Sequence, residues 1–455
     1  MAKYEAYPEY KDSGVEWIDS IPSHWEVRPT LALCDASTKK NIDGAENNVL
    51  SLSYGNIIPR NVEANFGLLP DSFNTYQIID RGDAILRLTD LQNDKNSLRV
   101  GLAKQKGIIT SAYLKLKAKD GINPTFLYRL LHSYDTTKVF YGMGGGLRQS
   151  MKFEDFRRLP LLLPPKEEQL NISAFLDHET AKIDNLIEKQ QQLIELLKEK
   201  RQAVISHAVT KGLNPDVPMK DSGIEWLGEV PEHWNVCRLK QIIKSGTSIS
   251  YGIVQPGDYL DEGVPFIQTT NVSQGNIDLD SLQRTSEKIE RNYPRSRLEG
   301  GEVILGIRAS IGSAYVVPLE LKGVNLSRGV ARIQPGKNIT SDYLVWYFKT
   351  NAVEQYWALS KQGSTFSEVS IETVRELIVC VPPKDEQHRI SSCLEGSLDK
   401  IHELIVKSEM QMSFLQERRT ALISAAVTGK IDVRDWVAPA NSEMANIEES
   451  PEVNA

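Results

Sequence analysis

The sequence predicts an α+β protein written twice, with two globular blocks joined by two long helices that form an antiparallel coiled coil. Three observations predict this class: internal repeats that frame each block, heptad-spaced apolar residues after each block, and short β-branched runs with glycine turns inside the blocks. Together they describe a pseudo-twofold internal repeat.

The first repeat precedes each block. Residues 11–27 (KDSGVEWIDSIPSHWEV) and 220–236 (KDSGIEWLGEVPEHWNV) are identical at 10 of 17 positions, including two tryptophans. Because tryptophan is rare, chance does not explain this match. We assign residues 1–22 to an N-terminal segment and residues 213–231 to its second copy, a linker.

The second repeat follows each block and begins a long helix. PPKEEQ at 164–169 matches PPKDEQ at 382–387, and the match continues without a gap to Ala-Val-Thr at 208–210 and 426–428. Proline is tolerated at a helix start, and the acidic residues suit the positive end of the helix dipole. We therefore predict helices over 166–212 and 384–430.

Apolar residues at alternating four- and three-residue steps predict a coiled-coil seam along both helices. The predicted seam contains Ile172, Leu176, Ile183, Leu186, Leu193, Leu197, Ile390, Leu394, Ile401, Leu404, Leu415 and Leu422. The polar seam positions Gln190 and Ser408 are candidates for setting the register. An ordinary bundle core is the alternative. Ile187, Ile194 and Ile405 widen the stripe, which favours a partner helix on the outer face.

The blocks, residues 23–165 and 232–383, carry the α+β pattern. Residues 82–86 and 301–305 echo each other as strands, and residues 122–133 and 339–350 echo each other as helices. Elsewhere the two blocks diverge. Two similar frames with different surfaces suit a protein that recognises two different targets.

Charge is distributed unevenly. The formal net charge is -7, but residues 23–165 carry 19 basic and 14 acidic groups, and residues 232–381 carry 16 of each. The acidic excess lies in the connecting segments and in the tail at 431–455, where we expect disorder. Contact with phosphates depends on the local field, so nucleic acid remains a candidate partner.

Several classes of function lack a signature. The four cysteines have no metal or redox spacing, and there is no GxxxxGK[ST] loop or HExxH motif. We expect no catalytic residue and no metal site, and we interpret His24 and His233 as packing residues. Without a leader-like N-terminus or an 18-residue apolar run, we expect a cytoplasmic protein without membrane contact.

Polar and basic residues near glycine-rich turns are the candidate DNA contacts. Asparagine, glutamine and arginine can pair with base edges, and glycine loops expose backbone amides to phosphates. An asparagine after glycine is more often a turn residue, and a solitary arginine is more often solvated. The candidates are Tyr54, Asn56, Arg87, Arg148, Gln149, Tyr251, Gln268, Asn271, Arg308, Lys361 and Thr365.

The order SGxEWxxxxPxHW, divergent block, PPKxEQ and long helix, repeated once, resembles the specificity subunits of type I restriction–modification systems. The resemblance implies two target recognition domains, each reading half of a bipartite double-stranded DNA site. It also implies two methyltransferase subunits that use S-adenosylmethionine, and restriction subunits that use ATP and Mg²⁺, in defence against phage. Base readout then maps to Tyr54, Asn56, Gln268 and Asn271, and phosphate contact maps near Arg87, Arg148, Arg308 and Lys361.

Two rival functions stay open at this point. A scaffold whose blocks bind protein or carbohydrate predicts no salt-sensitive association with DNA. A nuclease with an unrecognised site predicts metal-dependent cleavage by the isolated chain.

Overall fold

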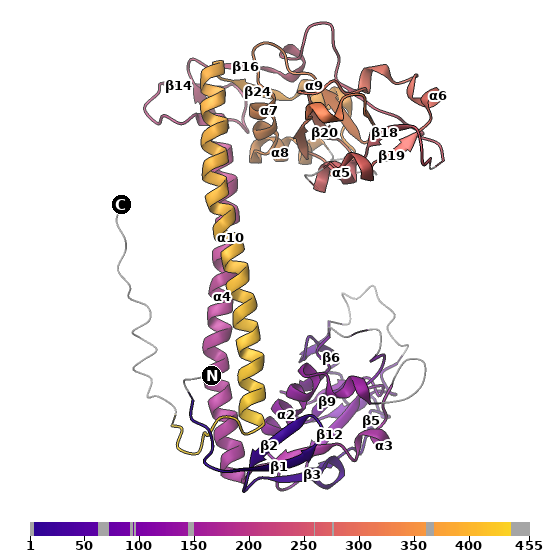
Figure 1. The fold of residues 1–455 in the computed structure, drawn as a ribbon, viewed down its shortest axis with the longest axis vertical. Helices are drawn as coiled ribbons and strands as arrows, with labels where there is room; N and C mark the ends of the chain where they lie inside the picture. The colour runs from indigo at the N-terminus through magenta and orange to yellow at the C-terminus, as the bar shows by residue number, and fades with distance from the viewer. Residues whose placement is uncertain are drawn as a thin grey trace. The chain divides into compact units, whose positions relative to one another are not determined.

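The computed structural model describes residues 4–61, 72–91, 94, 97–143, 150–258, 260–274, 277–360 and 368–437. The chain divides into two compact units, residues 1–190 with 410–455 and residues 191–409. We call them unit 1 and unit 2. Each contains one block, one repeat copy and a part of each long helix (Figure 1).

The block of unit 1 is made of short, mostly antiparallel strands. A four-stranded sheet has the order β10-β9-β12-β4, a three-stranded sheet has the order β11-β8-β5, and the pairs β1–β2, β3–β13 and β6–β7 complete it. The bounds are β1 (Tyr10–Val15), β2 (Ile18–Pro22), β3 (Glu26–Pro29), β4 (Cys34–Asp35), β5 (Lys39–Lys40), β6 (Leu50–Ser53), β7 (Asn56–Pro59), β8 (Gln77–Ile79), β9 (Ala84–Leu86), β10 (Val100–Leu102), β11 (Gly107–Ile109), β12 (Leu114–Ala118) and β13 (Pro160–Leu163).

Helix α2 (Pro124–Thr136) covers the four-stranded sheet of unit 1 and contacts β9, β10 and β12. Its start follows from the sequence, because Asn123 accepts hydrogen bonds from two backbone amides of the first turn and Pro124 occupies the first helical position. The short elements α1 (Thr30–Leu33), η1 (Val139–Gly142) and α3 (Phe153–Phe156) connect the strands.

Unit 2 repeats this plan. Its four-stranded sheet has the order β17-β23-β20-β21, its three-stranded sheet has the order β19-β18-β22, and β14–β15 and β16–β24 are separate pairs. The strands are β14 (Met219–Asp221), β15 (Glu229–Pro231), β16 (Asn235–Arg238), β17 (Ser250–Tyr251), β18 (Val264–Ile267), β19 (Gln283–Thr285), β20 (Val303–Gly306), β21 (Ala314–Val316), β22 (Asn325–Leu326), β23 (Val330–Ile333) and β24 (Ile378–Val381).

The helices of the second block are short, and α7 contacts the sheet at β20 and β21. They are η2 (Leu239–Gln241), α5 (Thr269–Gln274), η3 (Leu279–Ser281), α6 (Glu287–Glu290), η4 (Pro294–Ser296), η5 (Leu319–Leu321), α7 (Ser341–Phe348), α8 (Asn351–Ser360) and α9 (Ile371–Glu376). The echo between residues 82–86 and 301–305 has a structural basis, because β9 and β20 occupy the same interior place in the two four-stranded sheets.

Two long helices, α4 (Lys166–Lys211) and α10 (Lys384–Val427), contain 46 and 44 residues. At 1.5 Å per residue they are about 69 and 66 Å long. In unit 1 the start of α4 packs with the end of α10, and Arg419 Nε donates to Asp184 Oδ1 at 2.7 Å. In unit 2 the end of α4 shares a core with the start of α10. The helices therefore run antiparallel within each unit.

The buried stripe differs from the predicted seam at three positions, Leu186, Leu193 and Leu404. Leu186 and Leu193 are 48% and 41% exposed, whereas Ile194 is 3% exposed and Ile187 is partly buried. In α10, Leu404 is exposed and Ile405 packs against the core. At each of these places two apolar residues are adjacent in the sequence, and either one fits the heptad spacing. The packing of the two helices buries the second residue of each pair.

The other predicted seam residues lie in the core or against it. Ile172, Leu176, Ile183, Leu197, Ile390, Leu394, Ile401 and Leu422 are buried, and Leu415 is partly buried. The register candidate Ser408 is also buried, and the side-chain oxygen of Gln190 is buried without a hydrogen-bond partner.

The segment after α10 corrects the expectation of a disordered tail for residues 431–436. Ile431 and Val433 are buried, and the ring of Trp436 packs edge-on against Phe175 at 5.7 Å. The backbone N–H of Asp432 donates to the carbonyl of Glu5 at 2.9 Å. The N-terminal and C-terminal segments of the described chain thus lie together beside α4. Residues 438–455 lie outside the described part.

Candidate nucleic-acid interface

The β6–β7 hairpin carries Tyr54 and Asn56, two predicted base-reading residues. Ser53 pairs with Asn56, so Tyr54 and Gly55 alone form the turn, and both have positive φ, 46° and 76°. This two-residue turn normally prefers Asn-Gly. A left-handed conformation costs a side-chain-bearing residue roughly 1–2 kcal/mol. Tyr54 is nevertheless 85% exposed, whereas Asn56 donates from its amide to the Tyr54 carbonyl at 3.3 Å.

The base of this hairpin is fixed in the core of the block. Leu50 and Ile57 are buried in a cluster with Ile79, Ile85 and Ile109. A Cβ added at Gly101 would lie 2.6 Å from the Leu52 side chain, so the glycine lets the hairpin lie close against β10. The tip is therefore supported by a packed base.

A groove of about 450 Å³ lies beside the hairpin. Its lining includes Asn56, Lys104, Tyr128, Arg129, Asp177 and Arg419. Arg129 pairs with Asp177 at 2.7 Å and Arg419 pairs with Asp184, whereas Lys104 is exposed. The sequence reading missed these basic residues, because single cations on separate helices give no local pattern.

The predicted phosphate contact Arg87 is engaged within the block. Its Nη2 lies 3.0 Å from Asp94 Oδ2, and its side chain is half-buried. The neighbouring Arg99, which the sequence reading also missed, is fully buried and donates to the carbonyls of Arg87 and Thr89 and to the Tyr141 hydroxyl. Arg99 is thus a structural cation that shapes the loop after β9.

In unit 2 the candidates occupy less projecting positions. Tyr251 of β17 is 45% exposed, and it pairs with Ala331 of β23. Asn271 accepts the Gln268 backbone N–H at 2.9 Å, and the Gln268 amide donates to Gln283 Oε1 at 3.2 Å.

The remaining candidates are paired or undescribed. Arg308 lies 3.6 Å from Glu368, which also pairs with Arg328. Arg148, Gln149, Lys361 and Thr365 lie outside the described residues. The structure thus groups Tyr54 and Asn56 on one hairpin and Gln268 and Asn271 at the start of one helix.

The two repeated motifs meet in both units. In unit 1, Glu168 of the PPKEEQ motif accepts hydrogen bonds from the Trp25 indole at 3.0 Å and from the Tyr7 hydroxyl, and it lies 2.8 Å from His24 Nε2. In unit 2, Glu386 is bound by Trp234 at 3.2 Å and His233 at 2.9 Å. We call this arrangement the HW–Glu lock. Burial and the bond to Glu168 raise the pKa of Tyr7.

The next glutamine of each motif joins the block to the helix. The Gln169 amide donates to the carbonyls of Pro164 and Gly121, and its oxygen accepts the Asn123 N–H at 2.7 Å. Gln387 makes the same three bonds with Pro382, Asn338 and Thr340. The repeat therefore encodes the attachment of each block to its helix.

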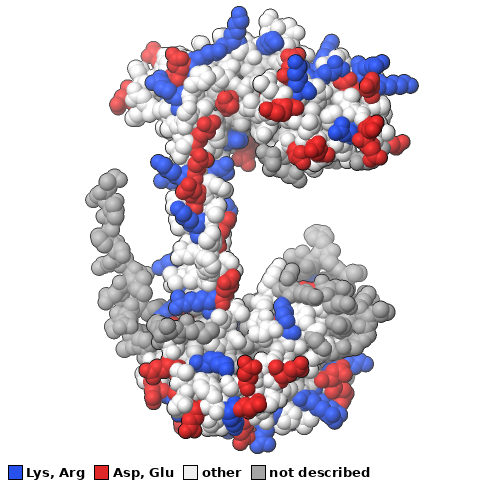
Figure 2. Space-filling model, viewed as in Figure 1, with Lys and Arg blue, Asp and Glu red and all other residues white. Residues whose placement is uncertain are grey.

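The outward faces of the helices expose apolar side chains in both units. Unit 1 presents Leu186, Met410 and Phe414, and unit 2 presents Leu193, Leu196, Leu404 and Val406. Figure 2 shows uncharged side chains between the acidic and basic ones along these helices. Exposed apolar residues on helix faces are typical of surfaces that pack against partner helices.

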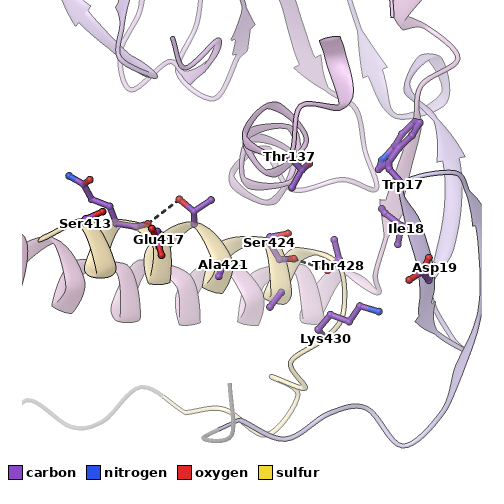
Figure 3. Close-up of a pocket in the computed structure, with 13 residues that line it drawn as sticks. Trp17, Ile18, Asp19, Thr137, Ser413, Glu417, Ala421, Ser424, Thr428 and Lys430 are labelled. Atoms are coloured by element: carbon purple, nitrogen blue, oxygen red, sulfur yellow. Dashed lines mark hydrogen bonds between the residues drawn. The ribbon is translucent and has the colours of Figure 1, made fainter. Parts of the chain in front are cut away.

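A second groove of unit 1, of about 730 Å³, is drawn in Figure 3. Trp17 and Asp19 of the first hairpin, Thr137 after α2, Ser424 of α10 and Thr428 just after α10 are among the residues that line it. The Trp17 ring packs edge-on against Tyr134 at 5.7 Å.

Among the residues that the structure describes, no group of three or more His, Cys, Asp or Glu side chains could hold a metal ion. In the same part of the chain, no helix has the length and apolar character to cross a membrane.

Comparison with known proteins relates the second half of the chain to a family profile and the chain to several specificity subunits. A family profile described as "Type I restriction modification DNA specificity domain" matches residues 231–408. The EcoBI specificity subunit of Escherichia coli is 27% identical over 277 residues, 60% of this chain and 58% of that subunit. The MjaVIII specificity subunit of Methanocaldococcus jannaschii is 25% identical, covering 79% and 81% of the two chains. Residues 231–408 thus match the type I DNA specificity domain, and the chain is similar to type I specificity subunits.

Solved structures agree with this family at the level of the fold. A chain from a study of complex assembly and conformational transition of the type I R-M system has a TM-score of 0.68 at 18% identity, covering 90% of this chain and 99% of that one. The HsdS subunit of Thermoanaerobacter tengcongensis has a TM-score of 0.51 at 17% identity, covering 90% and 98%. These likenesses confirm the predicted fold class. The match to the EcoBI subunit spans less than two thirds of that protein.

Proposed function

We propose that this chain is a type I specificity subunit and that it binds double-stranded DNA through its two blocks, each reading one half of a bipartite site. The observation that carries the proposal is that the same contacts join both blocks to the long helices, although the exposed surfaces of the two blocks differ. Both units hold their block with the HW–Glu lock and the same glutamine bonds, yet one block presents a hairpin tip and the other a flat strand.

The outward helix faces are the proposed docking surface for two methyltransferase subunits, with restriction subunits as further partners. The exposed apolar residues of α4 and α10 in each unit support this role, since such side chains are stabilised by contact with another apolar surface. S-adenosylmethionine, ATP and Mg²⁺ would be held by those partners, and this chain would supply site choice without catalysis.

The test is a map of methylated adenines in the host genome with the gene intact and deleted. We expect one bipartite motif to lose methylation when the gene is deleted. A second strain, in which residues 23–165 are exchanged for those of another specificity subunit, provides the control. It should change one half of the motif and keep the other half. A change in both halves would contradict the assignment of one half-site to each block.

A further inference from the structure

Tyr54 occupies a turn position at which the backbone conformation favours asparagine over tyrosine. It is the first of two turn residues with positive φ, a place that asparagine adopts with little strain and tyrosine adopts at a cost. Its side chain is 85% exposed, so core packing does not repay that cost. A contact between the ring and another molecule would explain why a tyrosine occupies this position.

The support of the tip makes such a contact effective. The hairpin base is buried through Leu50 and Ile57, and the Tyr54 carbonyl accepts the Asn56 amide. A ring carried on a rigid turn loses little freedom when it binds, which favours affinity. The exposed Lys104 lies in the groove beside Gly55 and Asn56, where a phosphate would find a cation.

We propose that Tyr54 is an aromatic wedge that stacks on a nucleobase of the half-site bound by unit 1. This proposal rests on the DNA-binding function proposed above and names the residue that makes the contact. An exposed aromatic ring stacks on any base through its π face, and wedge side chains enter base steps that are partly unstacked.

Unit 2 offers no equivalent tip at its own Tyr-Gly pair. Tyr251 lies in a paired strand, and a Cβ on Gly252 would lie 1.7 Å from the Leu326 carbonyl oxygen, so this backbone is held against its neighbour. The proposal therefore concerns the half-site bound by unit 1.

The experiment uses the full chain in complex with its methyltransferase subunits. The probe is a duplex oligonucleotide that carries the mapped site, with 2-aminopurine placed in turn at positions of either half. Tyr54→Asn removes the ring and suits the turn, Tyr54→Phe keeps the ring, and Ile42→Asn is the matched control at an exposed apolar residue of the same block. Affinity, 2-aminopurine fluorescence and thermal stability are measured for each variant.

We expect Tyr54→Asn to weaken binding about 10- to 100-fold, as loss of one stacked base predicts. The wild-type complex should change the 2-aminopurine fluorescence at a position of the unit 1 half-site, because the ring alters the stacking of the base there. Tyr54→Asn should abolish that change, with thermal stability equal to or above that of the wild type. Tyr54→Phe and Ile42→Asn should bind as the wild type does.

Two results would overturn the wedge while leaving the proposed function standing. One is wild-type affinity and fluorescence in Tyr54→Asn. The other is an equal loss in Tyr54→Phe, which would assign the contact to the hydroxyl. If the wild-type complex itself fails to bind the duplex, the DNA-binding function fails, and the wedge fails with it.

Discussion

Units 1 and 2 use the same lock in different surroundings. Glu168 is 4% exposed and is bound by Tyr7, His24 and Trp25, whereas Glu386 is 16% exposed and is bound by His233 and Trp234. The difference comes from the chain ends. Residues 4–7 and 431–436 meet over the lock of unit 1, where Arg434 lies 5.2 Å from the Tyr7 ring. The same motif therefore has a more buried partner set in one unit.

The helices are also attached differently. In unit 2, Gln202 of α4 donates to the Lys349 carbonyl at 2.6 Å, and Ser206 accepts the Asn351 N–H at 3.1 Å, so the chain between α7 and α8 is bonded to the helix. In unit 1 Thr137, directly after α2, lines the groove of Figure 3 instead. The two units thus share the repeated motifs but differ in how the block contacts the long helices.

The largest expected effect on stability comes from removing the glutamate of each lock, which tests whether the two locks differ in strength. Glu168→Ala leaves the buried Trp25 and Tyr7 donors without an acceptor, and we expect it to lower the free energy of unfolding by about 4 kcal/mol. Glu386→Ala, in the more exposed lock, should cost about 2 kcal/mol. Urea unfolding followed by circular dichroism measures both. The exposed neighbour Glu167→Ala is the control, and equal losses in the two units would show that the extra burial of unit 1 contributes nothing.

A smaller effect sharpens the assignment of the helix seam. Ile194→Ala removes a buried side chain and should cost about 3 kcal/mol, whereas Leu193→Ala should cost less than about 1 kcal/mol. The same unfolding measurement compares the adjacent variants on one helix. The reverse order of costs would restore the seam first predicted from the heptads.

The smallest effect concerns His132 of unit 1, whose pKa is lowered from 6.5 to about 4 by burial, with Arg419 and Arg129 adding to the shift. The unfolded chain binds this proton more readily, so stability present above pH 6.5 is lost as the pH falls toward 4. We expect a loss of about 2 kcal/mol between pH 7 and pH 5 from this residue. His132→Leu should reduce the pH dependence by that amount, and an unchanged slope would contradict the assignment.

The sequence patterns predicted the positions of the long helices better than they predicted which helix residues are buried. The PPKxEQ motif predicts helix starts because proline and acidic residues are favoured there, and α4 and α10 begin at Lys166 and Lys384. The heptads predicted the correct helices but the wrong facing at Leu186, Leu193 and Leu404. Leucine and isoleucine side by side satisfy either stripe, and only packing distinguishes them.

Part of the candidate site could be predicted from the sequence. Tyr54 and Asn56 were found because a polar Gly turn is a local signal, and the structure adds the strain and exposure that distinguish Tyr54. Arg87 was a candidate as a basic residue at the end of a strand, but its pairing with Asp94 shows only in three dimensions. Lys104, Arg129 and Arg419 come from separate segments and form one groove only in the fold.

By itself, the sequence determined the duplication, the two long helices, the limits of the frame and the family resemblance, since these depend on residue order and local propensity. The tertiary structure alone decided which apolar stripe is buried, why a tryptophan recurs beside a histidine, and which polar residues are free to meet a ligand. The physical reason is that burial, hydrogen-bond pairing and exposure depend on neighbours distant in the chain, such as Trp25 and Glu168 or Trp436 and Phe175.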